Sequence, residues 1–382
     1  MSIAYNIFKR YFVVLMSEMP PKKTHMVDFE PNTAKKFVDK LIHWNRTAND
    51  RHMPWKGEKD PYKIWLSEIM LQQTRVEQGL GYYNRFVATF PTIHHLANAP
   101  EQQVFKLWEG LGYYSRCRNL IHTAKYIAHE LGGVFPSDYA GILALKGVGG
   151  YTAAAIASFA YNQPYAVLDG NVFRVLARIF YIDLPIDSSE GKKHFAALAQ
   201  AILPKDKAGE YNQAIMDFGA VICKPSPECA TCFFARHCKA YLLNKQLAVP
   251  VKSKRTLVRE RWFQYLVLQH EGDIAIRQRL SKDIWQNLYE FFLLETAEAE
   301  APKEVLAQWR KAYGVRSAEY KVVEQGIEKV QRLSHQLIHF SFIHLQLSIR
   351  LPIEGMQWVP MQDLAQYPFP KTLQQHVQVL LG

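Results

Sequence analysis

Four of the five cysteines fall within one 16-residue segment, and this cluster constrains the possible folds more than any other feature. They are Cys223, Cys229, Cys232 and Cys238, whereas Cys117 stands alone. A disulfide-bonded secreted protein of this size would spread its bridges along the chain, so the cluster indicates a metal site in a reducing compartment. Thiolate ligands select zinc or an iron–sulfur cluster. Zinc sites usually show the C-x2-C spacing twice, so the C-x5-C-x2-C-x5-C pattern favours an iron–sulfur cluster, with zinc or free buried thiols as the alternatives.

The composition predicts packed domains and a polyanionic partner. With 382 residues, the chain is long enough for two or three domains. Hydrophobic residues make up 48% of the chain and aromatic residues 13%, which excludes disorder as the main state. No apolar stretch is long enough to predict a membrane span. The formal net charge of +11 favours nucleic acid or an acidic membrane surface as the partner.

Residues 1–26 are expected to form a disordered N-terminal extension. The basic pair at 9–10 and the apolar run at 11–16 loosely resemble a signal peptide. The run is too short for one, and no small-residue cleavage site follows it. A translation start at Met16, Met19 or Met26 is the alternative.

Residues 27–244 are expected to form an all-α domain. Phe37, Leu41 and Trp44 recur at the spacing of one helix face, and residues 195–202 repeat that pattern. No long alternating strand pattern occurs in this part of the sequence.

The pattern changes after this domain. Residues 245–261 are rich in Lys and Arg and are expected to form a basic linker. Residues 262–382 are expected to form an α+β domain. Local patterns there predict a strand at 262–268, a hairpin turn at 271–273, a short helix at 303–313 and a half-buried strand at 345–351.

A glycine-rich segment at about 143–155 predicts a hairpin between two helices. Gly147, Gly149 and Gly150 permit a tight turn, and the backbone N–H groups that start the second helix can hold a phosphate without reading a base. The segment therefore indicates a helix-hairpin-helix motif. The alternative is a helix junction that binds nothing. A Walker A loop is excluded because no Lys-Ser/Thr pair follows the glycines.

Two carboxyl groups are candidates for catalysis. Asp60 and Pro61 predict the start of a helix that continues to about Gln73, and Glu68 lies on its apolar side, where lost hydration favours a protonated acid. Asp169 lies at the start of another predicted helix, where it is either a capping residue only or an ionised carboxylate beside a developing positive charge. A surface or structural role is the alternative for Glu68. Together, an acid and a carboxylate fit the cleavage of a glycosidic bond.

These features in their order resemble the MutY-type adenine DNA glycosylases of the endonuclease III superfamily. The resemblance runs from about Val27 to the C-terminus. It is carried by Met53-Pro54-Trp55, Ser67–Thr74, Leu111–Arg116, the glycine-rich hairpin, Leu168–Val172 and the four clustered cysteines.

The resemblance implies two helical subdomains with DNA bound across a cleft and an extruded adenine in a pocket. It implies that Glu68 protonates adenine and helps to activate water, and that Asp169 stabilises or captures the cationic sugar, supported by Tyr151 and Asn171. Gln73 and Tyr113 would enter the base stack. The DNA-binding residues expected on this basis are Arg51, Trp55, Leu71, Gln72, Gln73, Thr74, Tyr113, Gly147, Gly149, Ser334 and His335.

Further expectations follow from the same resemblance. Lyase-competent relatives carry a Schiff-base lysine where this chain has Tyr151, so we expect a monofunctional glycosylase that does not cut the strand. The segment 283–291 resembles a Nudix-like domain, and no glutamate-rich catalytic helix follows it. Leu333-Ser334-His335 corresponds to a loop that inspects 8-oxoguanine, with Leu337-Ile338-His339 as the rival register.

The implied cofactor is a 4Fe-4S cluster on the four clustered cysteines. The implied partner is double-stranded DNA with adenine opposite 8-oxoguanine or guanine, bound by a monomer in the bacterial cytoplasm near the nucleoid. The alternatives are another mismatch or lesion glycosylase of this fold, and a non-catalytic protein that binds damaged DNA. Three departures from the family pattern are a first cysteine gap shorter by one residue, Lys146 in place of proline, and Phe292 in place of proline.

Overall fold

The computed structural model describes residues 31–253 and 258–382. The expected extension at 1–26 and part of the expected linker therefore lie outside the described residues. The described residues divide into two compact units, the first formed by 31–51 with 162–253, and the second by 52–161 with 258–382.

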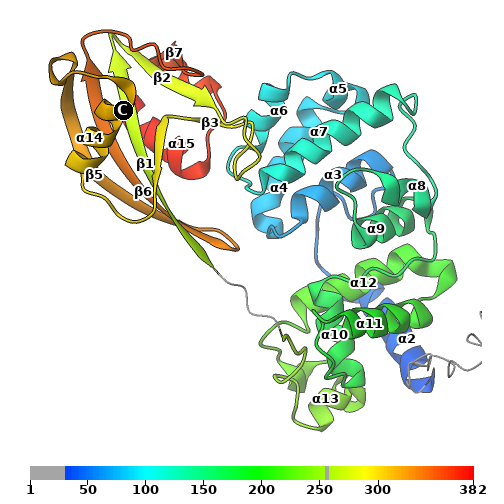
Figure 1. Cartoon of the computed structure of the whole chain (residues 1–382). Coiled ribbons are helices and arrows are strands. Elements are labelled where there is room, and N and C mark those ends of the chain that lie inside the picture. The colour runs from blue at the N-terminus through cyan, green and yellow to red at the C-terminus, as the bar shows by residue number, and fades with distance from the viewer. Residues whose placement is uncertain (1–30, 254–257) are drawn as a thin grey trace, which may run out of the picture. The chain divides into compact units, whose positions relative to one another are not determined.

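The first unit is helical in its described part (Figure 1). Phe37 and Leu41 are fully covered, and the ring of Phe37 meets the ring of Phe218 edge-on, which confirms the apolar face predicted for residues 37–44. Short 3-10 turns flank the clustered cysteines. The α-helices are α2 (Pro31–Thr47), α10 (Gly170–Phe180), α11 (Ser189–Ile202), α12 (Ala208–Val221) and α13 (Lys239–Leu242), and the 3-10 helices are η1 (Lys205–Lys207), η2 (Cys229–Thr231) and η3 (Ala235–His237).

The second unit begins with a helical part. Asp60 caps its first helix by accepting a hydrogen bond from the Tyr62 backbone N–H at 2.9 Å, as predicted. That helix ends at Leu71 and not at Gln73, because Gln72 has ψ 112°, outside the helical region, and Gln73 is left-handed with φ 56°. The helices are α3 (Pro61–Leu71), α4 (Val76–Thr89), α5 (Ile93–Asn98), α6 (Glu101–Trp108), α7 (Tyr114–His129), α8 (Tyr139–Ala144) and α9 (Gly150–Tyr161).

The rest of the second unit is a mixed sheet with helices. Strands β1 and β6 run parallel, and the other paired strands run antiparallel. The sheet order is β3-β2-β1-β6-β5, with β4 paired to β1 and β7 paired to β2. The elements are β1 (Arg259–His270), β2 (Asp273–Gln278), β3 (Tyr289–Glu290), β4 (Phe292–Thr296), α14 (Pro302–Tyr313), η4 (Ser317–Glu319), β5 (Tyr320–Arg332), β6 (Gln336–Leu347), β7 (Gln357–Pro360), η5 (Met361–Gln366) and α15 (Lys371–Leu381).

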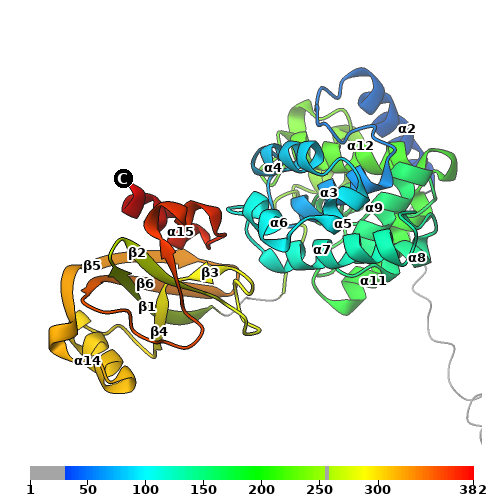
Figure 2. The same ribbon diagram turned by 90° about the horizontal axis from the view of Figure 1, so that it is seen from above.

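Alternation along β1 gives this sheet two apolar faces. Phe263 and Tyr265 belong to the same core cluster as Leu373 of α15, whereas Leu266 belongs to the cluster that holds Trp309 of α14. The two helices therefore cover opposite faces of the sheet (Figure 2). This arrangement confirms the predicted fold class, an all-α part followed by an α+β domain.

Local predictions in this domain hold with one difference. The turn at 271–273 and the helix at 303–313 are present, since β1 ends at His270 and α14 spans Pro302–Tyr313. The strand predicted at 345–351 ends at Leu347, and the side chain of Ile349 is 47% exposed. Among the described residues, no helix combines the length and apolarity needed to cross a membrane.

Candidate active site

Glu68 lies on α3 with only 5% of its surface exposed. Ile64 and Trp65, one turn earlier on the helix, are also buried, as are Ser67 and Ile69 beside it. The side of the helix that carries Glu68 is thus shielded from water, as its sequence pattern indicated.

Asp169 is the N-cap residue of α10. Its Oδ1 accepts a hydrogen bond from the Val172 backbone N–H at 2.7 Å, and its Oδ2 accepts one from Asn171 Nδ2 at 2.8 Å. Burial raises the pKa of Asp169, and the bonds from Val172 and Asn171 oppose that rise because they favour the ionised form. Arg174 Nη2 donates to Asn171 Oδ1 at 2.7 Å and so holds the amide toward the carboxylate.

A glycine makes room for this arrangement. A Cβ on Gly219 of α12 would lie 2.7 Å from the Cβ of Asn171, so a larger residue there would displace Asn171.

Two loops of the second unit hold non-glycine residues in left-handed conformations. Gln73 has φ 56° and Tyr113 has φ 50°, and the Tyr113 side chain is 42% exposed. Such conformations cost energy and persist only where surrounding contacts hold them. Leu71 and Gln72, just before Gln73, are half-buried.

Arg116 supplies those contacts. It lies in the Leu111–Arg116 motif, but no role was predicted for it from the sequence. Its guanidinium is buried, which lowers the pKa of Arg116 to about 10, and it lies over the Tyr113 ring at 5.2 Å. It joins the end of α3 to both loops through bonds to Ile69 O (3.0 Å), Met70 O (2.9 Å), Gln72 O (2.5 Å), Thr74 Oγ1 (3.2 Å) and Gly112 O (3.2 Å).

The predicted helix-hairpin-helix is formed by α8, the glycine-rich turn and α9. Gly147 has φ 83°, and a Cβ there would lie 2.7 Å from the Cβ of Asn119, so the turn requires glycine. The Thr123 hydroxyl donates to the Lys146 carbonyl at 2.9 Å and fixes the turn to α7. Gly149 is exposed and Tyr151 is half-buried in the first turn of α9.

The segment Leu333-Ser334-His335 forms the exposed turn between β5 and β6. The Leu333 N–H donates to Gln336 O at 2.7 Å, and Ser334 and His335 are exposed at the tip. In the rival register, Ile338 is fully buried within β6 and His339 stacks on Trp262, so that segment is part of the sheet.

This turn and the two loops lie at one cavity of the second unit. The cavity has a volume of about 470 Å³. The Tyr113 hydroxyl and the Ser334 hydroxyl share a hydrogen bond there. Of the residues predicted to bind DNA, Gln73, Thr74, Tyr113, Ser334 and His335 line it.

Two residues predicted to contact DNA also have contacts within the protein. Trp55 is 8% exposed and packs edge-on against Tyr83. Arg51 Nη1 donates to Oδ1 of the buried Asp217 at 2.7 Å. The DNA contacts expected of Trp55 and Arg51 stay predictions.

The four clustered cysteines line one pocket of the first unit, and Cys117 lies buried on α7 of the second unit. Arg178 is at the centre of that pocket's polar contacts: its Nη1 donates to Cys223 Sγ at 3.4 Å, and Cys238 Sγ donates to its carbonyl at 3.3 Å. Within residues 31–253 and 258–382, no three His, Cys, Asp or Glu side chains are placed as a metal-binding group. Four sulfur atoms around one pocket fit the donor set of an iron–sulfur cluster.

Comparisons with known proteins agree with this architecture. Residues 66–201 match the family model of the HhH-GPD superfamily base excision DNA repair proteins, and residues 264–378 match that of the NUDIX domain. The solved structure of a thermostable thymine-DNA glycosylase is similar to this chain, with 29% sequence identity and a TM-score of 0.51. The similar region covers 56% of this chain and 98% of the chain in that structure. Fold and matches together define a helix-hairpin-helix DNA glycosylase, which hydrolyses an N-glycosidic bond, with a second domain of NUDIX type.

Sequence relatives narrow this class to one family. An adenine DNA glycosylase of Buchnera aphidicola subsp. Baizongia pistaciae is 38% identical over 67% of this chain and 73% of its own length. One of Buchnera aphidicola subsp. Schizaphis graminum is 29% identical over 90% of this chain and 98% of its own. The human adenine DNA glycosylase is 38% identical over 53% of this chain and 39% of its own. The chain belongs to the adenine DNA glycosylase family.

Proposed function

We propose that this chain removes adenine from double-stranded DNA where adenine is paired with 8-oxoguanine or guanine. The observation that carries the proposal is that one chain combines a shielded Glu68 and a capping Asp169 with an exposed turn on a NUDIX-type domain. The first two supply the chemistry of glycosidic cleavage, and the third supplies a group that can inspect the opposite base.

Glu68 is the general acid of this proposal. It protonates the adenine ring, which makes the base a better leaving group, and afterwards it helps to activate the water that attacks the sugar. Its burial supports this role, because a carboxyl shielded from water can hold a proton until it reaches the substrate.

Asp169 acts as the anion that stabilises or captures the cationic sugar. Its bonds from Val172 N–H and Asn171 favour the ionised form against the cost of burial. Asn171 supports the site by orienting that carboxylate. Tyr151 occupies the position of the lyase nucleophile and has no amine to form a Schiff base, so we propose hydrolysis without strand cleavage.

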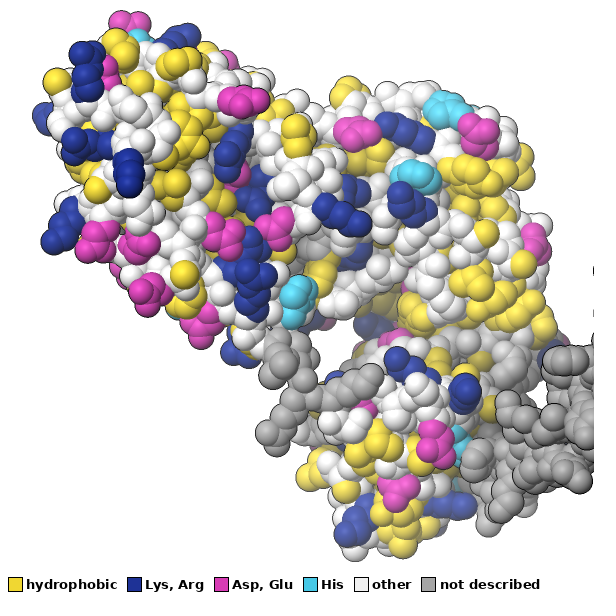
Figure 3. Space-filling model, in the orientation of Figure 1, with side chains coloured by type: hydrophobic (Ala, Val, Ile, Leu, Met, Phe, Trp, Pro, Cys, Tyr) yellow, Lys and Arg dark blue, Asp and Glu magenta, His cyan; other side chains and the backbone are white. Residues whose placement is uncertain are grey.

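Extruding a base requires groups that replace its stacking. Tyr113 suits this role because its ring is exposed on a loop that Arg116 holds in place, and Gln73 is presented in the same way. Leu71, Gln72 and Thr74 keep the Gln73 loop in place, and Gly147 and Gly149 of the hairpin bring backbone N–H groups to a phosphate. Lys and Arg side chains, interspersed with acidic ones, are spread over the face drawn in Figure 3.

Ser334 and His335 read the base opposite the adenine. The Ser334 hydroxyl can donate to or accept from a base edge, and the turn presents it to the cavity that Tyr113 also lines.

We further propose that Cys223, Cys229, Cys232 and Cys238 hold a 4Fe-4S cluster. It would hold the loop between α12 and α13 in one conformation, and no chemical step is assigned to it. Its thiolate ligands require reducing conditions, which the bacterial cytoplasm supplies. We propose that the enzyme acts there as a monomer.

One assay tests the function. The full chain is incubated with duplexes that carry adenine opposite 8-oxoguanine, guanine or thymine, and products are separated with and without alkali. We expect strand breaks only after alkali, fastest opposite 8-oxoguanine and absent opposite thymine. Release of thymine from a guanine–thymine duplex that is run in parallel would favour the other-lesion glycosylase, and no base release from any duplex would favour the non-catalytic alternative.

A further inference from the structure

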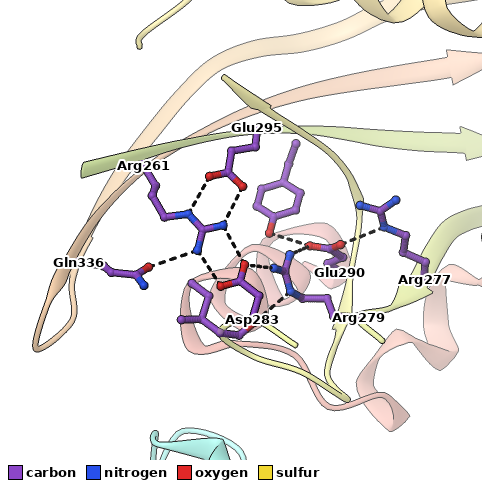
Figure 4. Close-up of polar contacts among 9 residues, drawn as sticks. Arg261, Arg277, Arg279, Asp283, Glu290, Glu295 and Gln336 are labelled. Atoms are coloured by element: carbon purple, nitrogen blue, oxygen red, sulfur yellow. Dashed lines mark hydrogen bonds and ion pairs between the residues drawn. The ribbon is translucent and has the colours of Figure 1, made fainter. Parts of the chain in front are cut away.

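A group of charged side chains surrounds one buried arginine in the second domain, next to Gln336 at the end of the exposed turn (Figure 4). At its centre is Arg261 of β1, whose side chain is 7% exposed. Its guanidinium binds both oxygens of Glu295 at 2.7 Å, and both oxygens of Asp283 at 3.0 and 2.8 Å. Two bidentate pairs fix the plane and position of the guanidinium more tightly than single contacts would.

The same guanidinium reaches the first residue of β6. Arg261 Nη1 donates to Gln336 Oε1 at 3.3 Å, and the Gln336 carbonyl accepts the N–H of Leu333 that closes the turn. Two residues earlier on β1, the Arg259 N–H donates to the His335 carbonyl at 3.0 Å. The start of β1 therefore holds the turn by one backbone contact and one side-chain contact.

Arg261 also holds the segment across from the turn. Asp283 accepts a further bond from Arg279 Nη2 at 3.0 Å, and Arg279 Nε donates to the Ile284 carbonyl at 3.2 Å. Asp283, Ile284 and Trp285 line the same cavity as Ser334. One guanidinium thus bonds to Asp283, which lines the cavity, and to Gln336, which follows the turn that lines it.

We propose that Arg261 is a positioning residue for base discrimination, acting through Gln336 on the turn and through Asp283 on the segment 283–285. This rests on the proposed reading of the opposite base by the turn. If the strand ends that flank the turn could shift, Ser334 would be presented in several orientations. A hydrogen bond to the edge of a nucleobase discriminates between bases only when the protein group that makes it is held in place.

The test measures single-turnover rates of the full-length protein on duplexes with adenine opposite 8-oxoguanine and opposite guanine. Gln336→Leu removes the acceptor and leaves both ion pairs of Arg261 in place. We expect it to lower the ratio of the two rates about 2- to 10-fold, the value of one net hydrogen bond. The rate opposite guanine and the salt dependence of binding should stay at the wild-type values.

Three further variants make the result specific. Gln336→Glu keeps an oxygen acceptor and should retain the wild-type ratio. Arg261→Lys cannot form both bidentate pairs and should lower the ratio at least as much as Gln336→Leu. Arg277→Gln is the matched control, because Arg277 Nε donates to Glu290 Oε1 at 2.9 Å and bonds to neither Asp283 nor Gln336 among the described residues, and it should leave the ratio unchanged.

The outcomes separate the inference from the proposed function. A wild-type ratio in Gln336→Leu overturns the positioning role, and so does an equal fall in both rates. If Arg261→Lys fails to fold, Gln336→Leu alone decides. A wild-type ratio in Ser334→Ala overturns the reading role of Ser334 in the proposed function, whereas Gln336→Leu still tests positioning of the turn because His335 remains on it.

Discussion

Glu68 is the residue whose replacement should separate DNA binding from chemistry. Glu68→Gln keeps the shape of the buried side chain but cannot donate the proton that adenine must receive. We expect the single-turnover rate of base release to fall by about 10²–10⁴ or more, the usual contribution of a general acid. Affinity for an adenine–8-oxoguanine duplex should stay within about threefold, or roughly 0.7 kcal/mol.

A matched variant controls for side-chain chemistry. Glu77 is exposed on α4, so Glu77→Gln should leave both rate and affinity unchanged. Wild-type base release by Glu68→Gln would remove Glu68 from the mechanism.

The pKa of Asp169 should determine where activity is lost on the acid side of the pH–rate profile. The mechanism uses its ionised form, and burial raises its pKa, so activity should be lost on acidification at a pH above the ordinary aspartate value of about 3.9. Asn171→Ala removes a bond that favours the ionised form, so the acid limb should move to still higher pH. Single-turnover rates measured across pH give this shift directly. An acid limb that moves to lower pH in Asn171→Ala would contradict the assignment.

At the scale of elements, two nearby glycines of the helix-hairpin-helix turn should differ in how well they tolerate replacement by alanine. Gly147→Ala meets a positive φ and a Cβ contact of 2.7 Å to Asn119, so it should lower the free energy of unfolding by about 1–3 kcal/mol. Gly149→Ala meets no atom within 4 Å and should leave stability unchanged. The melting temperatures of the two variants, measured by thermal unfolding, test this difference. Equal melting temperatures would contradict the requirement for glycine at position 147.

The loop of clustered cysteines predicts a defined iron content. Protein purified without oxygen should contain about four irons per chain and show broad visible absorbance, since four thiolates hold one cluster. Cys117→Ser should keep that content, because Cys117 lies on α7 away from the loop in sequence. Cys238→Ser should lower it. Stoichiometric zinc without iron would favour the zinc alternative.

Elements were predictable where their signals are local in sequence. Asp60 and Asp169 act as helix caps because a short side chain reaches a backbone N–H two or three residues away. The two buried arginines were not predictable. Arg116 finds its acceptor Ile69 O 47 residues away, and Arg261 finds Asp283 and Glu295 22 and 34 residues away. Such contacts depend on how elements pack, which no local pattern encodes.

The register of the proposed reading turn illustrates the same limit. From sequence alone, Leu333-Ser334-His335 and Leu337-Ile338-His339 compete, because both end in histidine beside a strand. The pairing of β5 with β6 leaves 333–335 between the strands and pairs Leu337 with Arg332, which supports the first register. Two candidate segments that lie four residues apart can be told apart only when the pairing with the partner strand is known.

At the scale of the whole molecule, chemistry and discrimination should be separable. Glu68, Asp169 and the hairpin all lie before residue 254. The match to the thymine-DNA glycosylase structure covers 98% of that chain but only 56% of this one. A shortened chain that keeps only the helical part should end at Ser253, because the residues just before that point are bound to the first unit. The Arg178 guanidinium donates to Val249 O at 3.3 Å, and the Ser253 N–H donates to Asp187 Oδ1 at 3.0 Å.

A chain ending at Ser253 should therefore excise adenine opposite guanine at a measurable rate and lose most of its preference for 8-oxoguanine. The lost contacts are those of the Ser334 turn, and hydrogen bonds to a base edge discriminate by roughly 1–3 kcal/mol, which corresponds to about 5- to 150-fold in the ratio of rates. Iron content and a cooperative thermal transition check that the shortened chain is folded. A shortened chain that keeps the full-length ratio would place lesion recognition in the helical part, and the residues to test would then be Gln73 and Tyr113.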